Sequence, residues 1–222
     1  MSMDLFMIFD PSTLMMLKMN WMSMIIIFLI YPFTYWFIPS RLNFMWILMY
    51  KYIMNELIPL INKKMKMNLL FFINLFIYIM INNIYSIFPY IFCASSHMVY
   101  SFSLCLPLWL SMINYGMYYK TNYSLAHYVP LSTPKMLISF MILIETISNI
   151  IRPLTLTIRL SANLTAGHLI LSLIGLSFFI SKMMFLIILI MQTFLFILEM
   201  SVSLIQSYVF SILLTLYFSE IK

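Results

Sequence analysis

Six ionisable side chains lie inside the two longest apolar stretches of the sequence. They are Glu145, Arg152, Arg159, His168, Glu199 and Glu220. A charge at the centre of a bilayer costs about 2.5 kcal/mol or more, so such groups usually face protein or water and mark an ion pathway. The alternative is that arginine and glutamate simply pair and hold helices together. For Glu145 and Arg152, seven residues apart, the sequence leaves both interpretations open.

The spacing of these residues predicts three polar levels in one helical hairpin. If two antiparallel helices turn at Ser181 and Lys182, the opposing pairs are Glu145 with Glu220, Arg159 with Gln206, and His168 with Glu199. A guanidinium does not lose its proton in proteins. Arg159 would therefore separate one titratable station near each face of the membrane, which predicts a proton path with a break in it.

The helix faces separate the arginine from the histidine. On an ideal helix one stripe holds Thr155, Arg159, Ala162, Asn163 and Ala166, and a face of the partner stretch holds Glu199, Ser203, Gln206 and Phe210. Small residues beside an arginine permit the close approach of another helix. His168 points nearly opposite Arg159, which favours a separate access route over one continuous wire.

The elements that position these groups are predicted to be membrane helices. The chain has 222 residues, of which 64% are hydrophobic and only 8% are charged, whereas a soluble domain carries about a quarter charged residues. Apolar runs long enough to span a bilayer recur, and neither β-barrel alternation nor tandem repeats occur. The predicted fold class is an all-α membrane protein, with residues 1–222 forming a single integral membrane domain.

About five spanning helices and one amphipathic surface helix are expected. The parts are an N-terminal span within 1–40 (Trp21 to Ile38), a surface helix at 41–68, a helical hairpin at 69–120 and a long tilted antiparallel hairpin at 136–222. The last two stretches exceed roughly 50 Å each at 1.5 Å per residue, against a hydrocarbon core of roughly 30 Å. They must be strongly tilted or kinked, and Pro153 is a natural kink position.

Lysine-rich gaps give the expected orientation. Residues 41–66 and 120–135 carry most of the basic side chains, and basic loops mark the matrix or cytoplasmic side. This distribution places the N-terminus outside and the C-terminus inside. It also differs from the basic face of a nucleic-acid-binding protein, so the net charge of +6 does not indicate nucleic acid.

Two segments together resemble a known family. IETISNIIRPLTLTIRLSANLTAGHLI (144–170), followed by LEMSVSLIQSYVFSILLTLY (198–217), is similar to subunit a of F-type ATP synthases in its mitochondrial form. The likeness is detailed from Met136 to the end and extends to the rest in layout. The block RL-x-AN-x-x-AGH carries most of its specificity. Heavy use of Met, Ile, Phe, Tyr and Asn is also typical of an AT-rich genome such as an animal mitochondrial one.

The resemblance implies a function and a set of residue roles. Two offset half-channels would deliver protons to and from carboxylates of a rotating c-ring, which couples proton flow to ATP synthesis. By resemblance, Arg159 is the essential charge barrier facing the ring, Glu145 belongs to the matrix-side half-channel, and His168 with Glu199 forms the outer one. Glu220 stands where a further acid of the inner proton path is expected. The remaining matches are supporting: Asn163 and Gln206 flank the arginine, and Arg152 is expected to be structural.

The implied setting is a multi-pass protein of the mitochondrial inner membrane, with its N-terminus in the intermembrane space and its C-terminus in the matrix. It would be no enzyme on its own but a subunit of a proton-transporting complex, without cofactor or metal. Its partners would be the c-subunit ring, other membrane-sector and peripheral-stalk subunits, and the lipid bilayer, with protons as the transported ion and no nucleic acid.

Other functions fit the residues less well. A haem-binding subunit needs paired histidines within spans, but His97 and His127 fall in predicted loops. A secondary transporter usually shows internal repeats, and a purely structural membrane subunit leaves three polar levels unexplained. Cys93 and Cys105 have no partner at metal-ligand spacing, so we interpret both as small packing residues.

Overall fold

The structure is a computed structural model that describes residues 5–12, 18–25, 32, 35–60, 66–119, 121–129, 134–180 and 185–220. Every regular element in these ranges is helical, which confirms the all-α prediction. Four of the described helices are long and apolar enough to cross a membrane. They are α3 (Lys66–Ile87), α4 (Met98–Tyr119), α6 (Ile138–Ile180) and α7 (Phe185–Glu220).

Of the predicted N-terminal span, Trp21 to Ile38, residues 26–31, 33 and 34 lie outside the described residues. The described N-terminal part contains two short 3₁₀ helices, η1 (Leu5–Phe9) and η2 (Met19–Met24), and η2 overlaps the start of the predicted span. Trp21 of η2 packs against the α3–α4 connection, with ring centroids 5.7 Å from Phe92 and 5.3 Å from His97. The N-terminal segment is therefore tied to the end of the molecule where α3 meets α4.

The predicted surface helix corresponds to α2 (Arg41–Leu57) and the short η3 (Ile58–Leu60) that follows it. Ser40 caps α2 by accepting a hydrogen bond from the backbone N–H of Asn43, and Pro59 lies in η3, close to the predicted interruption. The helix is shorter than expected, because α3 already begins at Lys66. The placement of α2 on a membrane surface stays a prediction.

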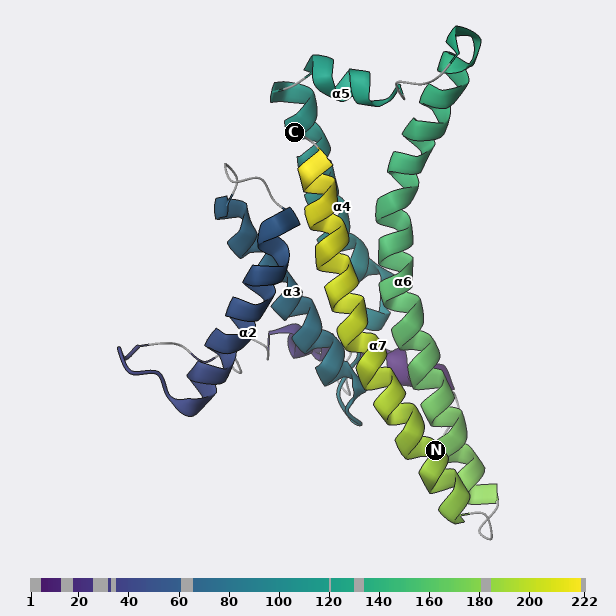
Figure 1. Cartoon of the computed structure of the whole chain (residues 1–222). Helices are drawn as coiled ribbons and strands as arrows, with labels where there is room; N and C mark the ends of the chain where they lie inside the picture. Colours follow the sequence, from purple (N-terminus) through teal and green to yellow (C-terminus); the bar gives the residue numbers. More distant parts are fainter. Residues whose placement is uncertain are drawn as a thin grey trace.

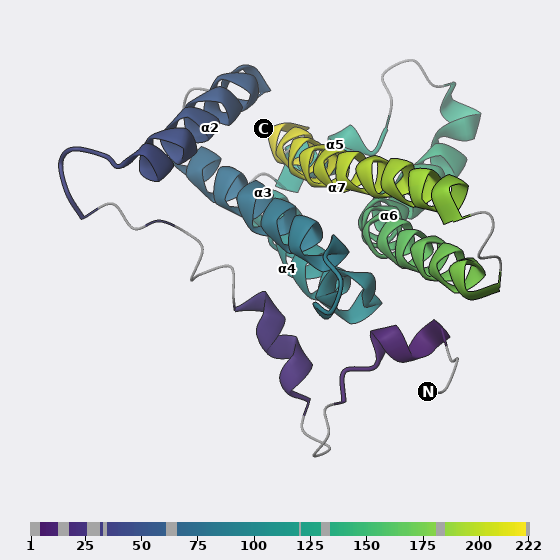
Figure 2. The same ribbon diagram turned by 90° about the horizontal axis from the view of Figure 1, so that it is seen from below.

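The core forms around α3, which packs along α7 and also contacts α2 (Figures 1 and 2). Ile73 and Ile79 of α3 are fully buried, and Phe72 stacks on Phe218 of α7 with ring centroids 5.6 Å apart. Helix α3 thus occupies the interior, although its sequence shows no strong apolar stripe.

The last two helices form the predicted antiparallel hairpin (Figure 1). They contain 43 and 36 residues, so they measure about 65 and about 54 Å at 1.5 Å per residue. Helix α6 continues through Pro153 as one element and contacts α4, where the thiol of Cys105 donates to the Pro153 carbonyl at 3.7 Å. Cys93 and Cys105 are both buried and free, as expected of packing residues.

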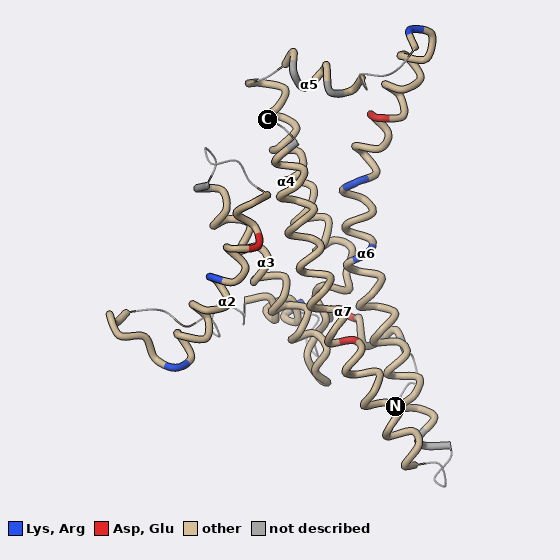
Figure 3. Tube along the Cα trace, viewed as in Figure 1, with Lys and Arg blue, Asp and Glu red and all other residues tan. Residues whose placement is uncertain are grey.

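The connection from α4 to α6 corresponds to the basic gap at 120–135. It contains a two-turn helix, α5 (Thr121–His127), and a 3₁₀ helix, η6 (Lys135–Leu137), at the start of α6. In Figure 1 α5 lies across the same end of the molecule as the C-terminus, opposite the α6–α7 turn. Charged residues are sparse along the whole trace and leave long uncharged stretches of helix (Figure 3).

Candidate functional site

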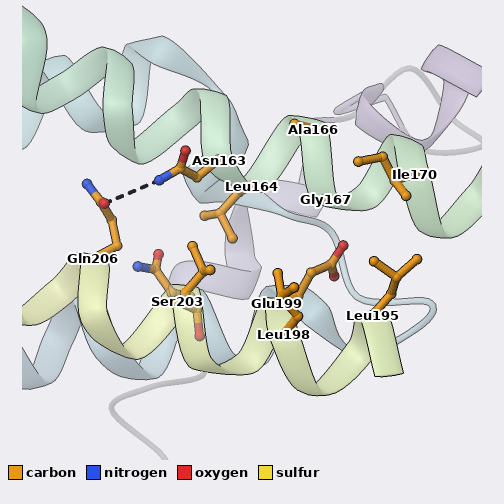
Figure 4. A pocket seen from close by; sticks show the side chains of 12 residues that line it. Asn163, Leu164, Ala166, Gly167, Ile170, Leu195, Leu198, Glu199, Ser203 and Gln206 are labelled. Atoms are coloured by element: carbon orange, nitrogen blue, oxygen red, sulfur yellow. Dashed lines mark hydrogen bonds between the residues drawn. The ribbon is translucent and has the colours of Figure 1, made fainter. Parts of the chain in front are cut away.

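The interface between α6 and α7 contains a polar contact in its middle. The side-chain amide of Asn163 donates to the Gln206 carbonyl oxygen at 3.3 Å (Figure 4). Gln206 is 6% exposed and the neighbouring Ser203 is 2% exposed, so both lie between helices. Gln206 therefore meets Asn163, one helical turn from Arg159, whereas the sequence predicted Arg159 itself at this level.

A second contact fixes the same register nearer the C-terminus. The guanidinium of Arg152 lies over the Tyr217 ring, 5.1 Å from its centroid, and its Nη2 is 3.8 Å from Glu145 Oε1. The residue numbers of the Arg152–Tyr217 and Asn163–Gln206 pairs have the same sum, so the register is constant between them. The predicted opposition of Glu145 and Glu220 is not seen, because the Glu220 side chain lies outside the described part of the chain.

Arg159 points away from the rest of the chain. All five residues of its predicted stripe (Thr155, Arg159, Ala162, Asn163 and Ala166) are exposed. The opposite face of α6 is buried, with Thr157 at 0% and Ser161 at 2% exposure. Among the described residues, no carboxylate lies within ion-pair distance of Arg159. The stripe thus presents a cation and small side chains to whatever lies outside α6.

Behind this stripe lies a cavity of about 220 Å³, here called the hairpin cavity. Its polar lining consists of Asn83, Asn163, Glu199, Ser203 and Gln206. Gly167 gives the Glu199 carboxylate its space, because a methyl group on Gly167 would lie 2.5 Å from Glu199 Oε1. Figure 4 shows Glu199 on α7 opposite Gly167 on α6. The glycine is therefore needed for room at this point of the helix.

A larger hollow of about 1110 Å³, here called the vestibule, lies beside the outer part of the hairpin. It is bounded by the N-terminal segment, the α3–α4 connection, α6 and α7, and its polar lining includes Asp10, Asn20, His168 and Gln192. The backbone N–H of Ser12 donates to Asp10 Oδ1 at 3.0 Å, which holds the pKa of this exposed carboxyl below its ordinary value. The vestibule therefore carries a carboxylate at neutral pH.

His168 and Glu199 stand between the two hollows. His168 lines the vestibule and Glu199 lines the hairpin cavity, and their side chains lie near enough to interact electrostatically. The Nε2 atom of His168 is buried and has no hydrogen-bond partner among the described residues, and the ring of Phe9 lies edge-on at 6.3 Å. As expected from its position on α6, His168 faces a different space from Arg159.

Two residues of this arrangement were not singled out from the sequence. They are Asn83 of α3 and Gly167 of α6. The signal for Asn83 is its place in an asparagine pair inside a stretch that is otherwise apolar. The role of Gly167 depends on the position of Glu199 on another helix, so no local sequence pattern predicts it.

Together these features define a class of protein: a multi-pass helical membrane protein with polar hollows inside a helical hairpin and an arginine on the outside of it. A family model described as "ATP synthase A chain" matches residues 15–219. The chain is 48% identical to "ATP synthase subunit a" of Locusta migratoria over 223 residues, covering 98% of each chain. It is 47% identical to "ATP synthase F(0) complex subunit a" of Rhopalosiphum padi over 222 residues, covering 99% of this chain and 100% of the relative. The chain belongs to the ATP synthase subunit a family.

Proposed function

We propose that this chain conducts protons through the membrane sector of an ATP synthase in the mitochondrial inner membrane. Family membership supports the complex, and the apolar helices support the membrane. Protons would enter from the outer side through one half-channel, pass to the carboxylates of a rotating c-ring, and leave through a second half-channel on the matrix side. The chain would be one subunit of the enzyme and not an enzyme alone.

The exposed stripe around Arg159 carries this proposal. A cation on a membrane helix is unfavourable unless a partner compensates it, and the described part of this chain offers no carboxylate to Arg159. A c-ring carboxylate arriving from outside would supply that partner. At about 4 Å and an intermediate dielectric the attraction is about 4 kcal/mol, enough to keep the passing carboxylate ionised. Ala162 and Ala166 would let the ring helices approach closely.

The outer half-channel is proposed to run through the vestibule to His168 and Glu199, and then into the hairpin cavity. The two hollows lie on either side of this pair, and both residues can exchange protons. Arg159 would prevent a water chain from joining this route to the inner one, because a guanidinium stays protonated. Asn163 and Gln206 would hold water and ring groups near it without neutralising it.

The inner half-channel is proposed to lie at the other end of the hairpin, where Glu145 and Glu220 occur. The C-terminus of α7 and the start of α6 would then face the matrix, and the N-terminus would face the intermembrane space. Lys135 at the start of α6 agrees with this orientation, since basic residues concentrate on the matrix side. Contacts with peripheral-stalk subunits would fall on surfaces outside the hairpin.

The decisive test is substitution of Arg159 in the assembled complex. Arg159→Ala should abolish ATP synthesis and allow passive proton flow, because the charge barrier is removed. Arg159→Lys should also block synthesis with a smaller leak, since a buried lysine can deprotonate and lacks the planar fork. The measurement is proton flux into vesicles at a fixed imposed potential, beside ATP synthesis in the same preparation.

Arg152, seven residues away, is the internal control, and its replacement should lower assembly more than coupling. Normal ATP synthesis by the Arg159→Ala complex would overturn the proposal. The chain would then be a structural subunit, whose charged residues hold helices together as Arg152 of α6 does through the Tyr217 ring of α7.

A further inference from the structure

Asn83, near the end of α3, is the most conspicuous buried polar group outside the residues discussed for the proton route. Its side chain is 0% exposed, and neither Nδ2 nor Oδ1 has a hydrogen-bond partner among the described residues. Burying an amide without partners is unfavourable, so such groups in native proteins are almost always bonded to protein or to ordered water.

The preceding residue shows what a satisfied asparagine looks like in the same helix. Asn82 is also buried, at 7% exposure, and its side-chain amide donates to the Tyr100 hydroxyl at 2.7 Å. The two asparagines are adjacent, so they face different directions from α3. Asn82 meets α4, whereas Asn83 lines the hairpin cavity.

The cavity can supply the missing partners. Its volume of about 220 Å³ holds several waters, since one water needs only about 10–15 Å³ of such space. Other polar groups share the cavity with Asn83, including the carboxylate of Glu199 and the hydroxyl of Ser203, which donates to the Met200 carbonyl and keeps its acceptor capacity. A water bonded to Asn83 would therefore have further partners.

We propose that Asn83 holds ordered water in the hairpin cavity, which makes α3 the third wall of the outer proton route. This inference rests on the proposed function and deepens it. The Asn83 amide both donates and accepts, so it can orient a water in either direction of proton passage. Asn83 is then a positioning residue that acts on Glu199 through water, and it does not itself exchange a proton.

The test compares two substitutions. One is expected to impair proton flux without impairing stability, and the other to impair stability with little effect on proton flux. Asn83→Leu keeps the volume and removes both hydrogen-bonding atoms, so assembly of the complex should be unchanged or better. Its proton-driven ATP synthesis should fall about tenfold, the rate equivalent of one ordinary hydrogen bond. Asn83→Ser leaves space for an extra water, so it should lower thermal stability while synthesis stays within about twofold of normal.

Asn82→Leu is the matched control. It removes the amide that donates to the Tyr100 hydroxyl, and this contact lies outside the hairpin cavity. This variant should lower stability and leave the synthesis rate per assembled complex unchanged. If instead the synthesis rate follows packing, so that Asn83→Leu is active and Asn83→Ser is impaired, the inference is overturned. A purely structural role would produce that order.

Two further measurements keep the inference separate from the proposed function. Glu199→Gln is assayed in the same vesicles. A loss of synthesis there, with none in Asn83→Leu, rejects the role of Asn83 alone, whereas normal rates in both reject the outer route itself. A density map of the unmodified complex should show water within hydrogen-bond distance of the Asn83 amide, and a dry cavity overturns the inference even if a variant fails to assemble.

Discussion

The two ends of the α6–α7 hairpin use the same kinds of residue in opposite ways. Towards the C-terminus, Glu145 and Arg152 form an ion pair at 3.8 Å, and Arg152 also lies over the Tyr217 ring. Towards the turn, Glu199 and His168 stand between two hollows, and His168 Nε2 has no hydrogen-bond partner among the described residues. One end is closed by its own side chains, and the other is left open.

This difference separates residues that hold helices in place from residues that could conduct protons. A carboxylate paired with a guanidinium is held in place by its neighbour, and the pair restrains two turns of helix. Polar atoms that line a hollow without partners need water to satisfy them, and water can carry a proton past them. We therefore propose that Arg152 has a mainly structural role beside the inner route at Glu145, and that the outer route runs past Glu199.

The largest effect is expected from Glu199→Gln. The amide keeps the size of the side chain but cannot take up and release a proton, so ATP synthesis should fall about a hundredfold, as for loss of a proton-transferring group. The complex should still assemble, because Glu199 makes no ion pair of the kind that joins Glu145 to Arg152. The measurement is proton-driven ATP synthesis per assembled complex.

Glu56→Gln supplies the same chemical change on the exposed side of α2 and should leave the rate unaltered. Unimpaired synthesis by Glu199→Gln would remove Glu199 from the proton path. The contrast between the two ends of the hairpin would then lose its functional meaning.

A smaller effect is expected from Gly167→Ala. The added methyl would lie 2.5 Å from Glu199 Oε1 and 2.8 Å from Cδ, so the carboxylate must move away. Because the carboxylate sits at the end of a flexible side chain, the hairpin should still form, and synthesis should fall about tenfold through displacement of the group. The measurement is the synthesis rate beside the melting temperature of the complex.

Gly175→Ala is the matched control in the same helix. A methyl on Gly175 meets nothing within 4 Å, so this change should only raise helix stability, by about 1 kcal/mol or less. Equal behaviour of the two variants would show that the space beside Glu199 has no special importance.

Much of the fold followed from the lengths of the apolar runs. The hairpins expected at 69–120 and 136–222 agree with α3 and α4 and with α6 and α7, because a bilayer-length apolar run with few charges has few other stable structures. Which helix lies at the centre could not be predicted. Helix α3 has no strong apolar stripe, so its periodicity does not reveal that α7 packs along it.

In the candidate site, the face of each helix that a residue occupies was predictable, but the contacts between helices were not. The stripe around Arg159 is exposed and the face with Ser203 and Gln206 is buried, as the 3.6-residue period indicated. Gln206 was expected level with Arg159 and meets Asn163, one turn further along α6, because residue numbers alone fix the register of a hairpin only to within about a turn. Asn83 could not be placed in the cavity, since a residue on another helix has no spacing relation to Glu199.

The smallest effect on coupling is expected at the closed end of the hairpin. Arg152→Gln removes both the pairing with Glu145 and the cation over Tyr217, so it should destabilise the α6–α7 contact by about 1 kcal/mol. Synthesis per assembled complex should stay within about twofold of normal, in contrast to the variants at Gly167 and Glu199.

A double-mutant cycle with Tyr217→Leu, read by thermal denaturation of the complex, isolates the contribution of the ring. If the effects of the two substitutions on stability are simply additive, the ring contact is not stabilising. A loss of synthesis as large as that of Glu199→Gln, with assembly intact, would place Arg152 in the proton path and reverse the distinction between the two ends.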